Sequence, residues 1–271
     1  MIQRKRNQMP KKLDGDTRLF PIIGDPIKFV KSPQGLTDGF AARGSNAVCI
    51  PMQVAKDDLD AVMHALTSTG NVDGLLVTMP HKFPAFSYCA TNSDTARLLG
   101  GVSVMRRNAD GSWHGDMLDG LAFVKAQIDH GACVKDGRAL LIGAGAAGSA
   151  IAIALLEAGV CELIIHDTDV SRSTRLSELV ADLGRGCVRV GPADPTGCTL
   201  VFNATPMGLA DHDPLPVSGD LLNSSMFVGD VIAGRGATPL LSAAQSLGCR
   251  TAHGVHMVEA VQEMMLDFFL G

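Results

Sequence analysis

The sequence predicts an α/β protein with two successive units, each built on a sheet flanked by helices. Short runs rich in β-branched residues alternate with longer segments of helical period, as in parallel strands joined by helices. This alternation occurs twice, first over residues 20–77 and again from residue 139 onwards. A length of 271 residues is typical of one or two domains, and the repeated alternation favours two.

The first unit is predicted to hold three short apolar strands, at residues 20–24, 47–51 and 74–77. Helical patterns lie between them, around 34–43 and 57–68. Strands that alternate with helices are expected to pair in parallel, with both faces of the sheet covered. The junction with the second unit is expected near residues 115–120.

The second unit is predicted to hold five strands, which begin near residue 139 and continue at 162–166, 187–190, 199–203 and 226–231. Residues 139–156 carry no charge, and this length is near the minimum for a membrane-spanning helix. Glycine and serine interrupt the stretch at positions that fit a strand, a turn and a helix, so we expect no membrane span. Residues 257–270 carry one apolar stripe at helical spacing, and this last helix is expected to pack back onto one of the units.

The formal net charge is −5, and it is unevenly distributed. Residues 1–18 carry a net charge of +4, which leaves −9 on the rest of the chain. A body this acidic argues against nucleic acid as a partner, because phosphate contacts need clustered lysine and arginine. The segment 1–18 is expected to be a flexible basic tail, and it lacks the apolar region of a secretory signal.

The seven cysteines form no Cys-x-x-Cys pair, and their number is odd. This pattern predicts reduced, mostly buried thiols in a cytoplasmic protein. The histidines and cysteines also lack the spacing of a metal site, so no metal is predicted.

The strongest local motif is a glycine loop between a predicted strand and a helical run: Gly143-Ala144-Gly145-Ala146-Ala147-Gly148. In a dinucleotide-binding loop the first glycine permits the tight turn, and the second lets the backbone approach a pyrophosphate. The third allows close packing of helix on strand, and the helix N-terminus offers free N–H groups to the phosphates. The alternative is a glycine turn that only packs a helix.

Asp167 follows the next predicted strand, 24 residues after Gly143. An acidic residue at this point accepts hydrogen bonds from the ribose 2′-hydroxyl and repels a 2′-phosphate, which predicts NAD as the preferred cofactor. Arg172 and Arg175 lie about one helical turn further on, so a phosphate contact, and with it NADP, stays open.

Four further blocks carry a resemblance that runs from about Phe20 to the C-terminus: KSP at 31–33, GLLVTMPHK at 74–82, GDMLDG at 115–120 and NATPMG at 203–208. In order and spacing, and together with the glycine loop, they resemble the shikimate/quinate dehydrogenase family. The resemblance implies a substrate-binding domain at 19–117, completed by 253–271, and a Rossmann dinucleotide-binding domain at 118–252. It also implies that the last helix returns to the first domain.

The resemblance further implies which residues act. Lys82 and Asp119 match the catalytic lysine and its partner aspartate, which handle a proton while a hydride passes between a cyclic alcohol and the nicotinamide. Four residues fall at substrate-binding positions: Ser32, Thr78, Ser103 and Val261. Five more fall at cofactor-binding positions: Asn203, Ala204, Thr205, Pro206 and Met207. Without the resemblance, Lys82 would be interpreted as an exposed lysine in a first helical turn and Asp119 as a helix cap.

Several positions depart from the family pattern by the loss or exchange of a polar side chain: Val30, Leu76, Ser103, Val104, Met117, Leu118, Ala233 and Val261. Each lost partner would leave an oxygen of shikimate unpaired, at a cost of about 1–3 kcal/mol. Three such losses would weaken the transition-state binding of shikimate by roughly two to six powers of ten. We therefore expect shikimate to be a poor substrate, and a less polar or differently substituted cyclic alcohol, or its ketone, to be preferred.

Two other functions stay open on the sequence alone. Folate-type and amino-acid-type dehydrogenases also join a lysine-bearing domain to a Rossmann domain, and a dinucleotide-binding sensor would keep the glycine loop without turnover. The spacing of Thr78, Lys82 and Asp119 favours the shikimate type. We expect a small-molecule substrate, no nucleic-acid or membrane partner, and either a monomer or a homodimer.

Overall fold

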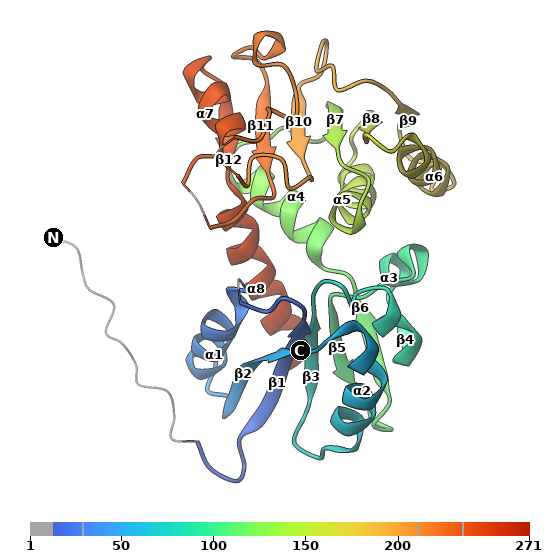
Figure 1. Cartoon of the computed structure of the whole chain (residues 1–271), viewed down its shortest axis with the longest axis vertical. Helices are drawn as coiled ribbons and strands as arrows, with labels where there is room; N and C mark the ends of the chain where they lie inside the picture. Colours follow the sequence, from blue (N-terminus) through green and yellow to red (C-terminus); the bar gives the residue numbers. More distant parts are fainter. Residues whose placement is uncertain (1–12, 29, 211, 235) are drawn as a thin grey trace, which may run out of the picture. The chain divides into compact units, whose positions relative to one another are not determined.

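The computed structural model describes residues 13–28, 30–210, 212–234 and 236–271 (Figure 1). Its internal contacts divide the chain into two compact units. The first comprises the described residues up to Ala96, together with Gly100–Asp116 and Gln262–Gly271. The second comprises Arg97–Leu99 and Met117–Val261. Each unit holds one six-stranded sheet.

The sheet of the first unit has the strand order β2-β1-β3-β5-β6-β4. Its strands are β1 Arg18–Gly24, β2 Ala47–Gln53, β3 Gly74–Val77, β4 Cys89–Asn92, β5 Val104–Arg107 and β6 Trp113–Asp116. The three predicted strands form β1, β2 and β3, which pair in parallel. The prediction that the whole sheet is parallel is wrong, because β5 runs antiparallel to both β3 and β6.

A tight hairpin produces the antiparallel half of this sheet. Residues 108–112 join β5 to β6, and Gly111 takes a left-handed φ of +83° within them. The N–H of Asn108 donates to the carbonyl oxygen of Ser112 at 2.8 Å, which closes the turn. The connecting sequence Asn-Ala-Asp-Gly-Ser consists largely of residues that favour turns, so a hairpin signal is present in the chain.

Helices cover both faces of the first sheet. They are α1 Ser32–Ala42, α2 Leu59–Ser68, the short α3 Asp94–Leu99, whose last turn belongs to the second unit, and the C-terminal half of α8 Gly254–Leu270. On one face α2 packs through Met63 and Leu66. On the other face the ring of Phe20 in β1 lies 4.5 Å from that of Phe40 in α1 and 4.8 Å from that of Phe269 in α8. The last helix therefore returns to the first unit, as the resemblance implies.

The sheet of the second unit has the strand order β12-β11-β10-β7-β8-β9. Its strands are β7 Arg138–Ile142, β8 Glu162–His166, β9 Cys187–Val190, β10 Leu200–Asn203, β11 Phe227–Asp230 and β12 Arg250–Ala252. Every pairing in it is parallel, as expected for a Rossmann fold. The five predicted strands all form, and only the three-residue β12 was not predicted.

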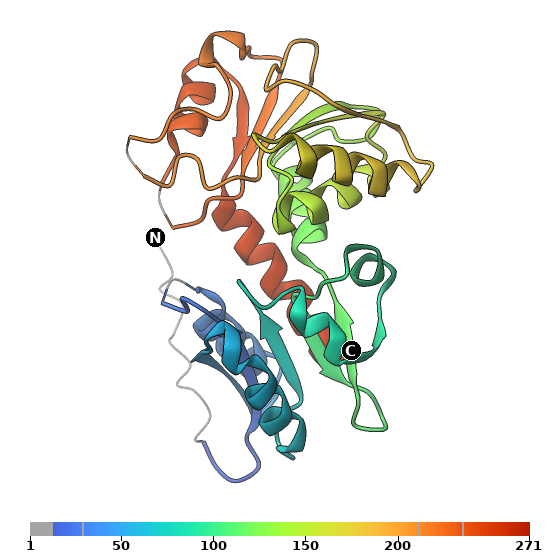
Figure 2. The same ribbon diagram turned by 45° about the vertical axis from the view of Figure 1, so that its right-hand side comes forward.

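Alternate residues of the central strand β7 face opposite sides of this sheet, as the strand period requires. Ala139 and Leu141 join the core made with α4 Asp119–Asp129, α5 Ala146–Glu157 and α6 Val170–Ala181. Leu140 and Ile142 join the core beneath α7 Pro239–Ser246. Figure 2 shows the ribbon of α7 on one side of this sheet and those of α5 and α6 on the other. With both faces covered, the loops at the carboxyl ends of the strands are left to form a binding site.

The division between the two compact units crosses α8 after Val261. The first turns of α8 contact the second unit, since the ring of His256 stacks on that of His130 at the end of α4, with 3.6 Å between the ring centres. The later turns contact α1, where Leu266 lies against Gly39. One continuous helix therefore contributes to both units.

Residues 1–12 of the predicted basic tail lie outside the described residues. Residues 14–18 make defined contacts, because the Thr17 hydroxyl hydrogen-bonds with Asp14 and Asn46, and Arg18 opens β1 and pairs with Asp73.

All seven cysteines are free thiols, but the expectation that most are buried is wrong. Cys133, Cys161 and Cys187 are exposed, because they lie in loops and at the start of the edge strand β9.

No helix in the described part of the chain has both the length and the apolar character needed to cross a bilayer. The uncharged stretch 139–156 forms β7, the glycine loop and α5.

Candidate active site

The glycine loop joins β7 to α5 in the second unit, and each of its glycines has a distinct environment. Gly143 takes a φ of +105° at the tight turn. A Cβ on Gly148 would lie 1.9 Å from the carbonyl oxygen of Gly143, so only glycine permits this approach of helix to loop. A Cβ on Gly145 would have no atom within 4 Å. The loop therefore leaves open space at the second glycine, beside the free N–H groups that begin α5.

Asp167 lies directly after β8, against the same loop. One carboxylate oxygen accepts the N–H of Ala144 at 2.7 Å, and the other accepts the N–H of Asp169 at 2.9 Å. The side chain is half-buried. The structure thus brings Asp167 and the glycine loop together at the carboxyl edge of the sheet.

The other predicted cofactor residues are Asn203, which ends β10, and the loop that follows it. Asn203 has no solvent exposure. Its amide bonds to Thr205 and Met207, so it organises the loop from within and faces no open space. Ala204, Thr205 and Met207 are half-buried and Pro206 is exposed, so these residues form the accessible surface of the loop.

A pocket of about 520 Å³ is lined by residues of this loop and of the segment that follows it: Pro206, Met207, Leu209, Ala210 and Asp213. The Asp213 carboxylate accepts the N–H groups of Ala210 and Gly208 at 2.9 and 3.0 Å. These bonds stabilise the charged form and hold the pKa of Asp213 below its usual value.

In the first unit, successive backbone bonds join the strand ends at one edge of the sheet. Val77 N–H donates to Ser103 O, and Ser103 N–H donates to Asp116 O, both at 2.8 Å. The turn that carries Lys82 is tied to the same edge, because Val102 N–H donates to Lys82 O at 2.8 Å. Thr78 follows Val77 directly. The predicted residues Thr78, Lys82 and Ser103 therefore lie at one edge of one sheet.

Ser32 is the first residue of α1, which begins after the loop that follows β1. Gln262 of α8 lies against Gly35 in the first turn of the same helix, since a Cβ on Gly35 would be only 2.3 Å from its side-chain oxygen. Gln262 lies off the apolar stripe of the last helix, yet its side chain packs against α1. Gln262 is therefore an additional polar group at the first turn of α1, the turn that Ser32 begins.

Asp119 and Val261 belong to the second unit, where both are buried. Asp119 is the first residue of α4, and the residue that precedes the helix, Leu118, makes no side-chain cap. The positions that lost polar side chains are mostly buried as well: Leu76, Met117, Leu118 and Val261. Val30 and Ala233 are half-buried.

Three polar residues that sequence reasoning missed are buried beside the predicted ones: His81, Asp230 and Thr238. The Nε2–H of His81 donates to Val54 O at 2.7 Å and fixes the turn before Lys82 to the end of β2. Among the described residues, the His81 Nδ1 atom has no hydrogen-bond partner. Asp230 ends β11, next to Asn203 in the sheet.

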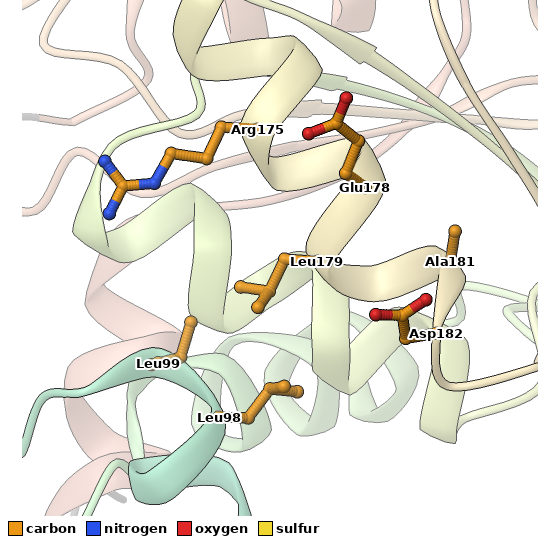
Figure 3. Close-up of a pocket in the computed structure, with 7 residues that line it drawn as sticks. All are labelled: Leu98, Leu99, Arg175, Glu178, Leu179, Ala181 and Asp182. Atoms are coloured by element: carbon orange, nitrogen blue, oxygen red, sulfur yellow. The ribbon is translucent and has the colours of Figure 1, made fainter.

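A second pocket of about 520 Å³ lies beside α6 (Figure 3). It is lined by Leu98, Leu99, Arg175, Glu178, Leu179, Ala181 and Asp182. The three leucines face one another, whereas Arg175 extends away from them. None of the predicted site residues lines it. Within the described ranges, no group of three or more histidines, cysteines or carboxylates is placed to hold a metal ion.

Comparison with known proteins gives consistent matches over most of the chain. The family model of the shikimate dehydrogenase substrate binding domain matches residues 22–105. The curated shikimate dehydrogenase (NADP(+)) of Rubrobacter xylanophilus is 35% identical over 253 residues, which cover 91% of this chain and 88% of that protein.

Solved structures show the same fold. Shikimate 5-dehydrogenase from Listeria monocytogenes, in complex with shikimate and NAD, has a TM-score of 0.90 at 24% identity, over 97% of this chain and 95% of that one. Quinate dehydrogenase from Corynebacterium glutamicum, in complex with NAD, has a TM-score of 0.86 at 27% identity, over 93% of both chains.

Proposed function

Because the chain belongs to the shikimate/quinate dehydrogenase family, we propose that it oxidises a cyclic alcohol with NAD and catalyses the reverse reduction of the ketone. Enzymes of this family are NAD(P)-dependent dehydrogenases. The observation that carries the proposal is the shared sheet edge of the first unit, where backbone hydrogen bonds bring the segments that hold Lys82, Thr78 and Ser103 together. A lysine and two hydroxyl-bearing residues at one sheet edge suit an alcohol whose proton must be moved.

We assign the transfer of the alcohol proton to Lys82. When a hydride leaves the carbinol carbon, the alcohol oxygen must lose its proton, and a lysine amine accepts it. In the reverse direction the ammonium group stabilises negative charge on that oxygen and returns the proton. Asp119 is assigned the partner role from its place in the family pattern, where a carboxylate favours the charged form that the lysine takes after it accepts the proton. The nicotinamide, when bound, supplies the hydride acceptor.

The dinucleotide is assigned to the glycine loop, and the residues present fit that group. The open space at Gly145 admits a pyrophosphate, and the start of α5 offers N–H donors and the positive end of the helix dipole. Thr205, Pro206 and Met207 are assigned to the nicotinamide half, on the loop after the neighbouring strand β10.

The substrate is inferred to be less polar than shikimate. Leu76, Met117 and Val261 offer no hydrogen bond at positions where polar side chains would meet the ring oxygens of shikimate. An unpaired buried oxygen costs about 1–3 kcal/mol, and sites built on hydrogen bonds discriminate strongly between such substrates.

Initial rates of NADH formation test this proposal, with NAD and a panel that contains shikimate, quinate and cyclic alcohols with fewer hydroxyl groups. We expect turnover of at least one alcohol, with kcat/KM for shikimate lower than the best value by about a hundredfold or more. Efficient turnover of shikimate would contradict the altered specificity. Tight NADH binding without turnover of any alcohol or ketone would instead favour a dinucleotide sensor.

The preference for NAD is inferred from Asp167, because its carboxylate would repel a 2′-phosphate. The nearby arginines do not offset it, since Arg172 pairs with Asp169 at 3.3 Å and Arg175 lines the pocket of Figure 3. We expect Asp167→Ser to raise the ratio of kcat/KM for NADP to that for NAD by about tenfold or more, equivalent to about 1.4 kcal/mol. The control is Asp182→Asn, an exposed carboxylate just past the far end of α6, which should leave this ratio unchanged.

A further inference from the structure

Asp230 and Asn203 end two neighbouring parallel strands of the second unit. They face each other in the register of β11 and β10, and neither has any solvent exposure. The Nδ2 amide of Asn203 donates to Oδ1 of Asp230 at 3.1 Å. Burial of a carboxylate costs free energy unless its hydrogen bonds are satisfied, so the partners of Asp230 decide whether this pair is tolerated.

The carboxylate of Asp230 joins three segments. Besides Asn203, it accepts the N–H of Ile232 at 3.0 Å and the hydroxyl of Thr238 at 2.8 Å. The Thr238 oxygen in turn accepts the N–H of Leu241 and caps α7. Burial raises the pKa of Asp230, and the hydrogen bonds from Ile232, Thr238 and Asn203 counteract this rise. The electrostatic influence of His253, directly after β12, also lowers the pKa of Asp230.

The contacts of Asn203 continue from the carboxylate into the loop. A carboxylate only accepts hydrogen bonds, so the amide nitrogen of Asn203 must face Asp230. The amide oxygen then faces Thr205, from which it accepts the N–H at 3.0 Å and the hydroxyl at 2.6 Å. The Thr205 oxygen accepts the N–H of Met207 at 3.1 Å. The orientation of one amide therefore determines the shape of residues 204–207.

We propose that Asp230 is a positioning residue for the dinucleotide: by orienting the Asn203 amide, it holds the loop Ala204–Met207 in its binding shape. The inference rests on the proposed function, in which this loop contacts the cofactor. It predicts that disturbance of the 203–230 pair weakens dinucleotide binding, although neither side chain reaches the cofactor.

Asn203→Asp tests the inference by placing a second carboxylate next to Asp230. Two adjacent carboxylates share one proton at acid pH and repel each other once it is lost. We expect the dissociation constant of NADH, followed by its fluorescence, to exceed the wild-type value by about tenfold or more near pH 8.5. The difference should shrink as the pH is lowered towards about 6, where one of the two carboxyls regains its proton.

Two further variants connect the effect to Asp230 and separate it from a general loss of structure. The double variant Asn203→Asp/Asp230→Asn removes the repulsion, so NADH affinity near pH 8.5 should return to within about threefold of wild type. Thr238→Val removes another donor of the same carboxylate and the cap of α7; it should lower the melting temperature without changing NADH affinity.

The inference is overturned if Asn203→Asp binds NADH as wild type does at every pH, or if the double variant does not recover. If Asn203→Asp does not fold, Asn203→Ala replaces it: a pH-independent loss of affinity of about tenfold is expected, and unchanged affinity overturns the inference. Failure of the wild-type protein itself to bind NADH would contradict the proposed function instead.

Discussion

Replacement of Lys82 by alanine is expected to lower kcat by about 10²–10⁴-fold, the usual contribution of a positioned proton-transfer group. The dissociation constant of NADH should stay within about threefold of wild type, because Lys82 and the glycine loop belong to different units. The measurement is the steady-state rate with the best alcohol of the panel, together with a fluorescence titration of NADH.

Lys56→Ala is the matched control for this variant. Lys56 is an exposed lysine of the same unit, in a short turn before α2, and its removal should leave both quantities unchanged. A Lys82→Ala variant that keeps kcat within about threefold of wild type would contradict the role assigned to this residue.

Alanine at Gly145 is expected to weaken NADH binding, whereas alanine at Gly148 is expected to destabilise the fold. At Gly145 the new Cβ meets no atom within 4 Å and the backbone has a φ of −78°, so folding should be unaffected. The Cβ would occupy the space assigned to the pyrophosphate, and the dissociation constant of NADH should rise by about tenfold or more. At Gly148 the new Cβ would lie 1.9 Å from the carbonyl oxygen of Gly143 and should destabilise the fold by about 1–3 kcal/mol or more.

Thermal melting and NADH titration of the two variants separate these effects. Gly145→Ala should keep the wild-type melting temperature and lose affinity, whereas Gly148→Ala should melt at a lower temperature in the absence of ligand. Wild-type affinity in Gly145→Ala would support the alternative in which the glycine loop only packs a helix.

Most strands of the second unit were predictable because they are buried apolar runs, whereas the edge strand β9 is largely exposed and is marked by its two valines. Strands β7 and β10 are buried almost throughout, since helices or loops cover both faces of the sheet. The hairpin of the first unit was missed for the opposite reason. Strands β5 and β6, Val-Met-Arg-Arg and Trp-His-Gly-Asp, are four residues long and half polar, so no periodic pattern develops.

The candidate site also contains residues that the sequence pattern reveals and residues that it does not. The glycine loop, and Asp167 after the next strand, can be recognised from residue types and spacing alone. Asp230 and His81 were missed because their partners are distant in the chain: each is separated by 27 residues from the group it bonds to, Asn203 and Val54 respectively. Only the pairing of strand ends brings these groups together.

The direction in which the Asn203 side chain points could not be predicted from the sequence either. Its place in the NATPMG block identifies it with the cofactor loop, but the block is the same whether the amide faces the ligand or the interior. Complete burial and the bonds to Thr205 and Asp230 show that it faces the interior.

Hydride transfer between a cyclic alcohol and the nicotinamide can be followed directly with NADH that carries deuterium at the nicotinamide C4. The protein is incubated with the labelled cofactor and a panel of cyclic ketones, and the alcohols are analysed by mass spectrometry. Wild type is expected to form an alcohol that carries deuterium on its carbinol carbon, and Lys82→Ala to form it about 10²–10⁴-fold more slowly. Absence of deuterated alcohol from every ketone, while NADH binds, would contradict the proposed hydride transfer.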